Sequence, residues 1–266
     1  MDRAVRFSQG RLPLLVSIPH AGLRLTPTVA RGLVAAARSL PDTDWHIPRL
    51  YDFAHGLGAS VIAGEYSRFV IDLNRPEDDQ PLYAGATTGL YPATLFDGQP
   101  LFEDGLAPGA VVRAAYLEQV WRPYHDALHR ELVRLRQVFG YALLWDAHSI
   151  RSHVPRLFDG TLPDFNLGTF NGTSCDHVLA ECLQGVCAQA SGYRHVLNGR
   201  FKGGHITRRY GDPLQHVHAV QLELAQRTYM DESEPFAYRE DLAQGTQVIL
   251  RQLLTTMLEW GRMRYA

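Results

Sequence analysis

Two histidines stand at the ends of apolar, strand-like runs of the sequence. His20 closes the run 14–20, and His148 closes the run 141–148. Open α/β sheets bind ligands where strands end at their carboxyl edge, so two imidazoles delivered there by separate strands can share one metal ion. A lone histidine in such a place is more often a hydrogen-bonded core residue, but the pair, with acids around it, indicates a metal-dependent enzyme.

A catalytic zinc site takes three protein ligands and keeps a fourth position for water. The best candidate for the third ligand lies in segment 41–46, where Asp42 and Asp44 precede a predicted helix. We favour Asp44. The ordinary alternative is that one of the two carboxylates caps that helix.

A water that attacks an amide also needs a carboxylate to accept and return its proton. Glu223 is the candidate, because it lies in the apolar run 220–224 and an acid buried there is costly without a partner or a catalytic role. A structural salt bridge is the alternative. His218, a few residues earlier, can reach the same site, whereas His125 and His129 share helical spacing but lack the glutamate of the HExxH motif.

Anionic substrates need cations, and the planar guanidinium of arginine suits carboxylates best. Two clusters offer such groups, one around the predicted strand 69–73 and one in segment 207–211. Taken singly, each arginine is more often solvated or paired with a neighbouring aspartate. The candidate substrate-binding residues are Arg68, Asn74, Arg75, Arg208, Arg209 and Tyr210.

The composition excludes several classes of protein. The net charge of −2 and the lack of a basic run argue against a nucleic-acid partner. The chain shows no signal-peptide h-region and no run of eighteen apolar residues, which predicts a cytoplasmic protein without a membrane span. Its three cysteines are odd in number and close together, which fits reduced thiols.

The 266 residues predict a single α/β domain, 1–266, in three α/β/α layers around a mixed, largely parallel sheet. Apolar periodicity predicts helices over 111–139 and 238–260 and a third starting near a Ser174 cap. Segment 76–109 is rich in Pro, Gly, Asp and Thr and has no period, so we expect a long loop or insertion near the active site. The predicted strands are 14–18, 60–63, 69–73, 141–145, 195–197 and 219–224.

A series of segments in order along the chain resembles the N-formylglutamate amidohydrolase family. The resemblance spans nearly the whole sequence and implies the zinc-carboxypeptidase-like fold that this family shares with aspartoacylases. His205 departs from the aromatic residue expected after Gly203 and Gly204. The segments that carry the resemblance are 16–22, 42–45, 66–68, 72–75, 146–149, 164–169, 202–204, 207–211 and 221–223.

The resemblance implies a function as well as a fold. Zinc, or another divalent metal, would be held by His20, Asp44 and His148, and Glu223 would serve as the base in the hydrolysis of N-formyl-L-glutamate to formate and L-glutamate, the last step of a histidine degradation route. Substrate carboxylates would lie on the two arginine clusters. The alternatives are a related amidohydrolase or peptidase acting on another N-acyl amino acid, and a non-catalytic ligand-binding relative.

Overall fold

The centre of the structure is a sheet of seven strands in the order β1-β3-β2-β4-β7-β5-β6. The structure is a computed structural model that describes residues 4–82 and 88–266. In that order the strands are β1 (Val5–Ser8), β3 (Ser60–Gly64), β2 (Leu14–Ile18), β4 (Ala142–Ile150), β7 (Val217–Ala225), β5 (Phe165–Gly168) and β6 (His195–Leu197).

The sheet is mixed but largely parallel, as predicted. β2 runs parallel to β3 and β4, β4 to β7, and β5 to β6, whereas β1 and β5 pair antiparallel with β3 and β7. Every residue of β4 and β7 is buried, because helices cover both faces of these central strands. This double burial is the reason that they appear as apolar runs in the sequence.

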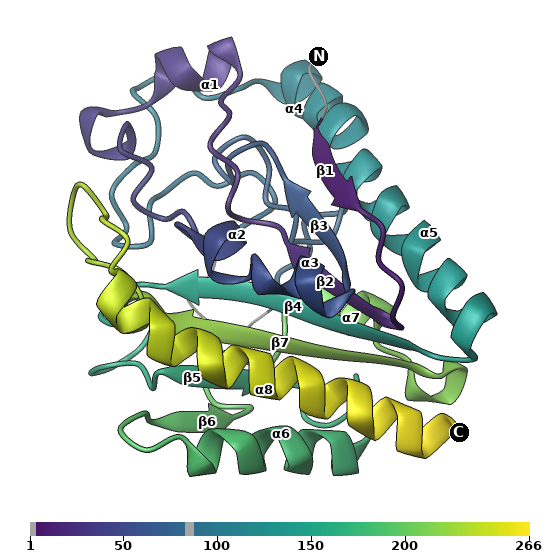
Figure 1. Cartoon of the computed structure of the whole chain (residues 1–266). Coiled ribbons are helices and arrows are strands. Elements are labelled where there is room, and N and C mark those ends of the chain that lie inside the picture. The colour runs from purple at the N-terminus through teal and green to yellow at the C-terminus, as the bar shows by residue number, and fades with distance from the viewer. Residues whose placement is uncertain (1–3, 83–87) are drawn as a thin grey trace.

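Helices form a layer on each face of the sheet (Figure 1), which confirms the three-layer prediction. Successive strand residues alternate between two core clusters, as the period of a strand requires. One cluster packs against α2 (Ile47–Leu50), α3 (Phe53–Leu57), α6 (His177–Gln189) and α8 (Glu240–Tyr265). The other packs against α1 (Pro27–Gly32), α4 (Ala110–Tyr116), the π-helical turn η2 (Leu117–Trp121), α5 (Arg122–Phe139) and α7 (His205–Tyr210).

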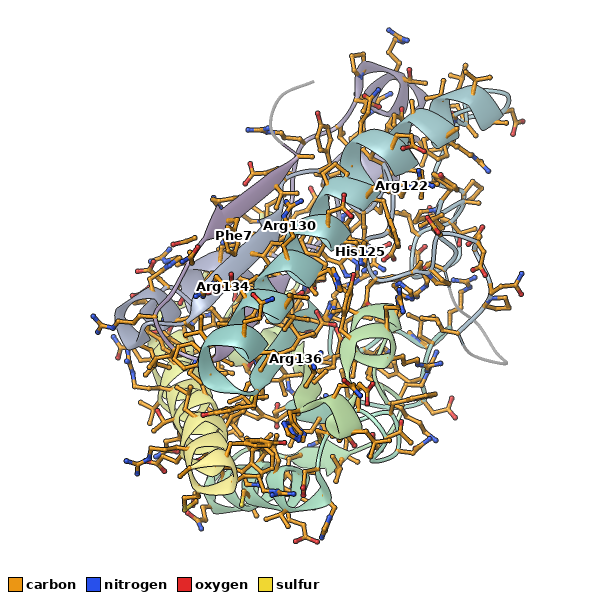
Figure 2. The ribbon with its side chains drawn as sticks, turned by 90° about the vertical axis from the view of Figure 1, so that its right-hand side faces the viewer. Phe7, Arg122, His125, Arg130, Arg134 and Arg136 are labelled. Atoms are coloured by element: carbon orange, nitrogen blue, oxygen red, sulfur yellow. The ribbon has the colours of Figure 1, made fainter. Side chains whose placement is uncertain are left out.

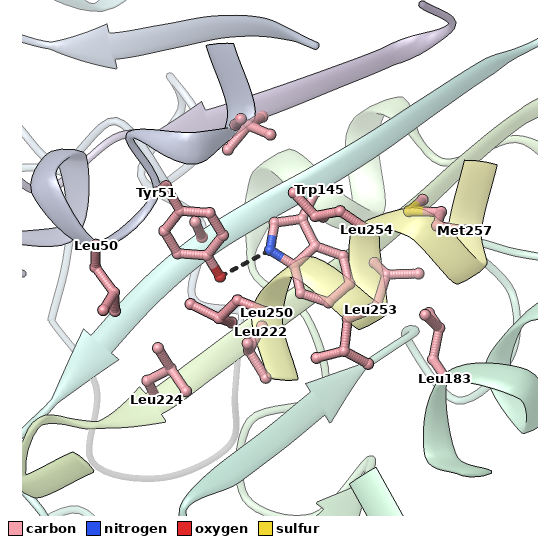
Figure 3. Packing of buried hydrophobic residues seen from close by; sticks show 14 of the residues in the cluster. Leu50, Tyr51, Trp145, Leu183, Leu222, Leu224, Leu250, Leu253, Leu254 and Met257 are labelled. Atoms are coloured by element: carbon pink, nitrogen blue, oxygen red, sulfur yellow. Dashed lines mark hydrogen bonds between the residues drawn. The ribbon is translucent and has the colours of Figure 1, made fainter. Parts of the chain in front are cut away.

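Trp145 of β4 is the largest side chain that is fully buried, and it lies among leucines of β7 and α8 (Figure 3). Its indole Nε1 donates a hydrogen bond of 2.9 Å to the hydroxyl of Tyr51. A buried indole N–H without a partner costs about 1–3 kcal/mol, so this bond lets a large apolar ring occupy the core. The pair ties the end of α2 to the strand that carries His148.

The predicted helix 111–139 is present as α4, η2 and α5 in succession. The wider π turn comes just before Pro123, which has no N–H to donate and whose ring would clash with the carbonyl four residues earlier. The predicted helix 238–260 is α8. The third predicted helix is α6, but its N-cap is Asp176, whose side chain accepts a hydrogen bond from the Val178 N–H, and not Ser174.

The predicted strand 69–73 is wrong. These residues are buried and apolar, but their backbone forms turns: Val70 N donates to Ser67 O, and Asp72 N donates to Leu90 O. The Ser67 hydroxyl also accepts from Phe69 N (3.2 Å), a local bond that competes with strand pairing. The sequence pattern also failed to predict the short strands β1 and β5.

In the described part of segment 76–109 the structure shows turns and isolated bridges rather than helices or strands. Residues 83–87 of the predicted loop lie outside the described residues. Among the residues that the structure describes, no helix is long and apolar enough to span a membrane.

Candidate active site

His20 and Asp44 are brought together by the backbone. His20 lies two residues after β2, and its carbonyl oxygen accepts a hydrogen bond of 3.1 Å from Asp44 N. Both side chains are buried, with exposed fractions of 3% and 1%. This backbone bond brings the carboxylate of Asp44 to the carboxyl end of β2. The helix cap predicted for Asp42 or Asp44 is wrong, because α2 begins after His46 without a side-chain cap.

His148 completes a three-residue group with His20 and Asp44. One donor atom from each residue lies within 4.8 Å of the other two, which is the arrangement that can hold a metal ion. The Asp44 Oδ2 atom lies 3.2 Å from His148 Nδ1 and 3.8 Å from His20 Nδ1. Asp42 faces elsewhere, since its Oδ2 atom accepts a hydrogen bond of 2.8 Å from Phe96 N.

A second carboxylate orients each imidazole from its far side. The Nε2 atom of His20 lies 2.7 Å from Asp72 Oδ1, and that of His148 lies 3.1 Å from Asp146 Oδ2. In its neutral form, which metal binding requires, a ring that donates its Nε2 proton to a carboxylate carries its lone pair on Nδ1. Both Nδ1 atoms therefore point toward Asp44, as donors to one ion require.

Asp146 is itself held by a buried chain of hydrogen bonds. Ser17 Oγ of β2 donates to Asp146 Oδ1 (2.9 Å), and the Tyr124 hydroxyl lies 2.9 Å from the same Ser17 oxygen. Since Ser17 uses its proton on Asp146, Tyr124 is the donor to Ser17. The chain links α5 through two neighbouring strands to His148.

The charges around the two rings have opposite effects. Burial alone would lower the pKa of His148, but Asp146 and then Asp44 outweigh it and raise that pKa well above its usual value. At His20, burial and the Arg68 guanidinium together lower the pKa despite Asp72. Burial opposes ionisation of Asp72, yet His20 and Arg68 hold its pKa well below the usual range.

Glu223 lies beside His148 because the two residues are direct partners in the β4–β7 register. Paired residues on neighbouring strands share one face of the sheet. Burial raises the pKa of Glu223 to about 8, against the opposing effect of His148. Gln221 Nε2 lies 3.3 Å from the Glu223 carboxylate. This buried acid thus adjoins the three-residue group.

Arg68, Asn74 and Arg75 line the same cavity as His20, His148 and Glu223. The cavity has an empty volume of about 590 Å³, part of it open to solvent. Arg68 Nη2 donates to Asp72 Oδ2 (2.6 Å), and its guanidinium lies 4.6 Å from the centre of the Phe96 ring. Arg75 Nε donates to Thr88 O (2.7 Å).

The structure places the second predicted cluster, on α7, outside this cavity. Arg208 turns back to its own loop, with Nε donating to Gly203 O (2.8 Å). Arg209 is exposed and, with Tyr210, lines a neighbouring cleft. The helix still adjoins the site, because Ile206 N donates to Asn74 Oδ1 (2.8 Å).

His125 lies in that neighbouring cleft, on the side of α5 toward α7 (Figure 2). Its Nδ1 atom lies 2.9 Å from the Tyr210 hydroxyl, and its Nε2 donates to Leu73 O (2.9 Å). His129 is exposed and lines the same cleft, but among the described residues neither histidine belongs to a group of three that could hold a metal ion. His218 bonds to Asp176 N and to the Tyr265 hydroxyl, away from the cavity, contrary to the expectation that it reaches the site.

Sequence reasoning missed several residues that line the cavity. Gln221 could have been predicted from the sequence, because residues two apart on a strand share a face and Gln221 lies two residues before Glu223. The others come from loops or from the strand end and carry no periodic signal. They are Thr88, Phe96, Ser149, Ile150, Leu157, Arg200, Phe201 and Gly204.

Two histidines, a carboxylate and an adjacent buried glutamate are the groups that hydrolytic metal sites use. Together with the α/β fold, they define the class of the protein as a hydrolase. The comparisons with known proteins give the particular family. The sequence model of the N-formylglutamate amidohydrolase family matches residues 12–230. The chain belongs to the N-formylglutamate amidohydrolase family, as its motifs predict.

Two curated relatives are named N-formylglutamate deformylase. The one from Pseudomonas putida is 76% identical over 100% of this chain and 99% of its own, and the one from Pseudomonas aeruginosa is 68% identical over 100% of both. The crystal structure of N-formylglutamate amidohydrolase from Ralstonia eutropha JMP134 is similar in fold, with a TM-score of 0.84, 22% identity and coverage of 98% of this chain and 99% of that one. A gene product from Agrobacterium tumefaciens aligns with a TM-score of 0.72, 15% identity and coverage of 97% and 94%.

Proposed function

We propose that this protein hydrolyses the formamide bond of N-formyl-L-glutamate to formate and L-glutamate. The observation that carries the proposal is the shared cavity, at which the three-residue group that can hold a metal ion meets the buried Glu223 and arginine side chains. The names of the relatives at 76% and 68% identity support this substrate.

The donor set fits zinc or a similar divalent metal. His20 Nδ1, Asp44 Oδ2 and His148 Nδ1 would be the ligands, since the Nε2 atoms of the two histidines are engaged by Asp72 and Asp146. Two imidazoles and one carboxylate are a common catalytic zinc set. Bound there, the metal supplies a Lewis acid that lowers the pKa of water and polarises the formyl carbonyl.

Glu223 is the proton carrier. A cation at His148 and Asp44 would favour its ionised form, so it begins the reaction as a base. It accepts a proton from the attacking water and returns it to the amide nitrogen as the C–N bond breaks. A carboxyl group whose pKa burial has raised toward neutrality is suited to both steps.

Arginines handle the negative charges. Arg68 lies 3.5 Å from His20 Nδ1 and is held by Asp72, so its guanidinium can stabilise the oxyanion that develops on the formyl group. Asn74 and Arg75 lie next to one another on the cavity wall and bind the carboxylate beside the reacting nitrogen.

The test is formate release from N-formyl-L-glutamate by the purified protein, before and after chelation and after adding zinc back. We expect activity that chelation removes and zinc restores. Glu223→Gln should retain bound zinc but lose most turnover, whereas His20→Ala should lose both. A protein that binds zinc but deformylates only other N-acyl amino acids would contradict the substrate, and one that binds no metal would contradict the site.

A further inference from the structure

One part of the cavity wall has no role in the chemistry described above. It is formed by the loop after β4 and by the segment between β6 and α7, which contribute Leu157, Arg200 and Phe201. Phe96 adds a further apolar surface to the same cavity. This wall therefore combines apolar side chains with one guanidinium.

The position of Arg200 is set by its neighbours. Its Nε donates a hydrogen bond of 2.6 Å to Leu157 O, across the gap between the two loops. Its guanidinium carbon lies 5.6 Å from the centre of the Phe201 ring, and the side chain is half-buried. The Nε bond to Leu157 helps to orient the guanidinium plane at the cavity surface.

The segment that carries Arg200 is anchored at both ends. Before it, Asn198 N donates to Leu167 O of β5 (2.7 Å). After it, Gly204 N donates to Gln221 Oε1 (2.7 Å), and α7 is held at Asn74. Arg200 is therefore fixed relative to Glu223 and to the Asn74–Arg75 pair, on which the proposed reaction depends.

The proposed substrate has two carboxylates. One is on the α-carbon, next to the reacting nitrogen, and the other ends the side chain, two methylene groups beyond the α-carbon. Arg68 forms an ion pair with Asp72 beside the three-residue group, and Arg75 donates a hydrogen bond to the carbonyl oxygen of Asn74. Arg208 and Arg209 do not line the cavity. Arg200, beside apolar groups that can contact the methylenes, is the lining cation that these roles do not use.

We propose that Arg200 binds the side-chain carboxylate of the substrate and thereby selects acidic N-formyl amino acids. This inference rests on the proposed function and assigns to Arg200 the contact that the sequence pattern suggested for Arg208 or Arg209. The selected class is an N-acylated dicarboxylic amino acid. Replacing the side-chain carboxylate by a carboxamide of the same shape removes the charge that Arg200 recognises.

The test compares Arg200→Gln with the unmodified protein on N-formyl-L-glutamate and N-formyl-L-glutamine. A charge-assisted contact of this kind corresponds to about a 10- to 150-fold change. We expect kcat/KM for the glutamate compound to fall by that factor, mostly through KM. For the glutamine compound kcat/KM should change less than about 3-fold, because a neutral carboxamide forms no ion pair with the guanidinium. Arg200→Lys should restore part of the preference, because it keeps the charge.

Arg156→Gln is the matched control, since it removes one positive charge from the neighbouring loop at an exposed side chain that does not line the cavity. Its substrate preference should be unchanged. Equal losses on both substrates in Arg200→Gln, with thermal stability and metal content preserved, would overturn the assignment. Formate release from neither compound by the unmodified protein would instead contradict the proposed function, and the role of Arg200 with it.

Discussion

Replacing Gly204 by alanine should damage the active site without touching a charged group. A Cβ atom at this position would overlap the side-chain amide of Asn74, with the Asn74 Cγ and Oδ1 atoms at 2.7 Å. Asn74 cannot retreat freely, because its Oδ1 accepts from Ile206 N (2.8 Å) and its amide lies against the buried His148 ring. Gly204 itself is tied to Gln221.

The size of the effect follows from what the displaced amide loses. A buried N–H of Ile206 without its acceptor costs about 1–3 kcal/mol, so Gly204→Ala should lower the free energy of unfolding by that amount. Replacing a residue that orients a metal ligand typically lowers activity by about 10- to 100-fold. We expect a loss of kcat/KM for N-formyl-L-glutamate in that range, because Asn74 also lies on the cavity wall.

The assay is formate release combined with urea denaturation, and Gly185→Ala is the matched control. Gly185 lies within α6, and nothing is within 4 Å of a Cβ added there. That change should leave activity intact and stabilise the protein by up to about 1 kcal/mol, since alanine favours helices. If Gly204→Ala matched this control in both measurements, the close packing of Gly204 on Asn74 would be refuted.

Three further predictions concern regions around the site and the core. His218 accepts a hydrogen bond from Asp176 N, and burial lowers its pKa to about 4. The stability that its neutral form contributes is therefore present above about pH 6.5 and is lost as pH falls toward 4, by up to about 3 kcal/mol in urea melts. His218→Gln should reduce this loss, and parallel pH profiles of the two proteins would contradict the prediction. Trp121 Nε1 donates to Arg75 O (2.9 Å), so Trp121→Phe should raise KM for N-formyl-L-glutamate about 5-fold, and an unchanged KM would argue against this support. Burial raises the pKa of Cys187 to about 12, so a thiol reagent at neutral pH should label it only as the protein unfolds; rapid labelling of the native protein would contradict its burial.

The sequence predicted the parts of the fold that depend on periodic burial. The runs around His20 and His148 belong to β2 and β4, and the long amphipathic stretch is α5 with its neighbours, because residues buried on two faces or along one stripe leave a repeated apolar signal. The same signal predicted that His20 and His148 meet, since strands that run parallel deliver their ends to one edge, whereas Asp44 lies in a loop and was a candidate only as an acid before a predicted helix.

Features set by loop paths could not be predicted in this way. Segment 69–73 is as apolar as a strand, yet bonds to Ser67 and Leu90 fold it into turns. Arg208 and Arg200 both stand near the Gly203–Gly204 pair in the sequence, but only Arg200 faces the cavity, because a bond to Leu157 in a distant loop directs it there. Such bonds join residues far apart in the chain and leave no local pattern.

The pairing of β4 with β7 has a consequence for how this family can diversify. His148 and Glu223 are held opposite each other within a register of consecutive pairs from Ala142–Val217 to Ile150–Ala225. A slip by one residue would turn every side chain to the other face, so main-chain geometry encodes the spacing of the proposed metal ligand and the proposed base. Arg200 and Leu157 lie in loops, which tolerate substitution and insertion far better. Selection for new N-acyl substrates, in nature or in the laboratory, therefore has its freedom in those loops, while the reactive pair is inherited unchanged.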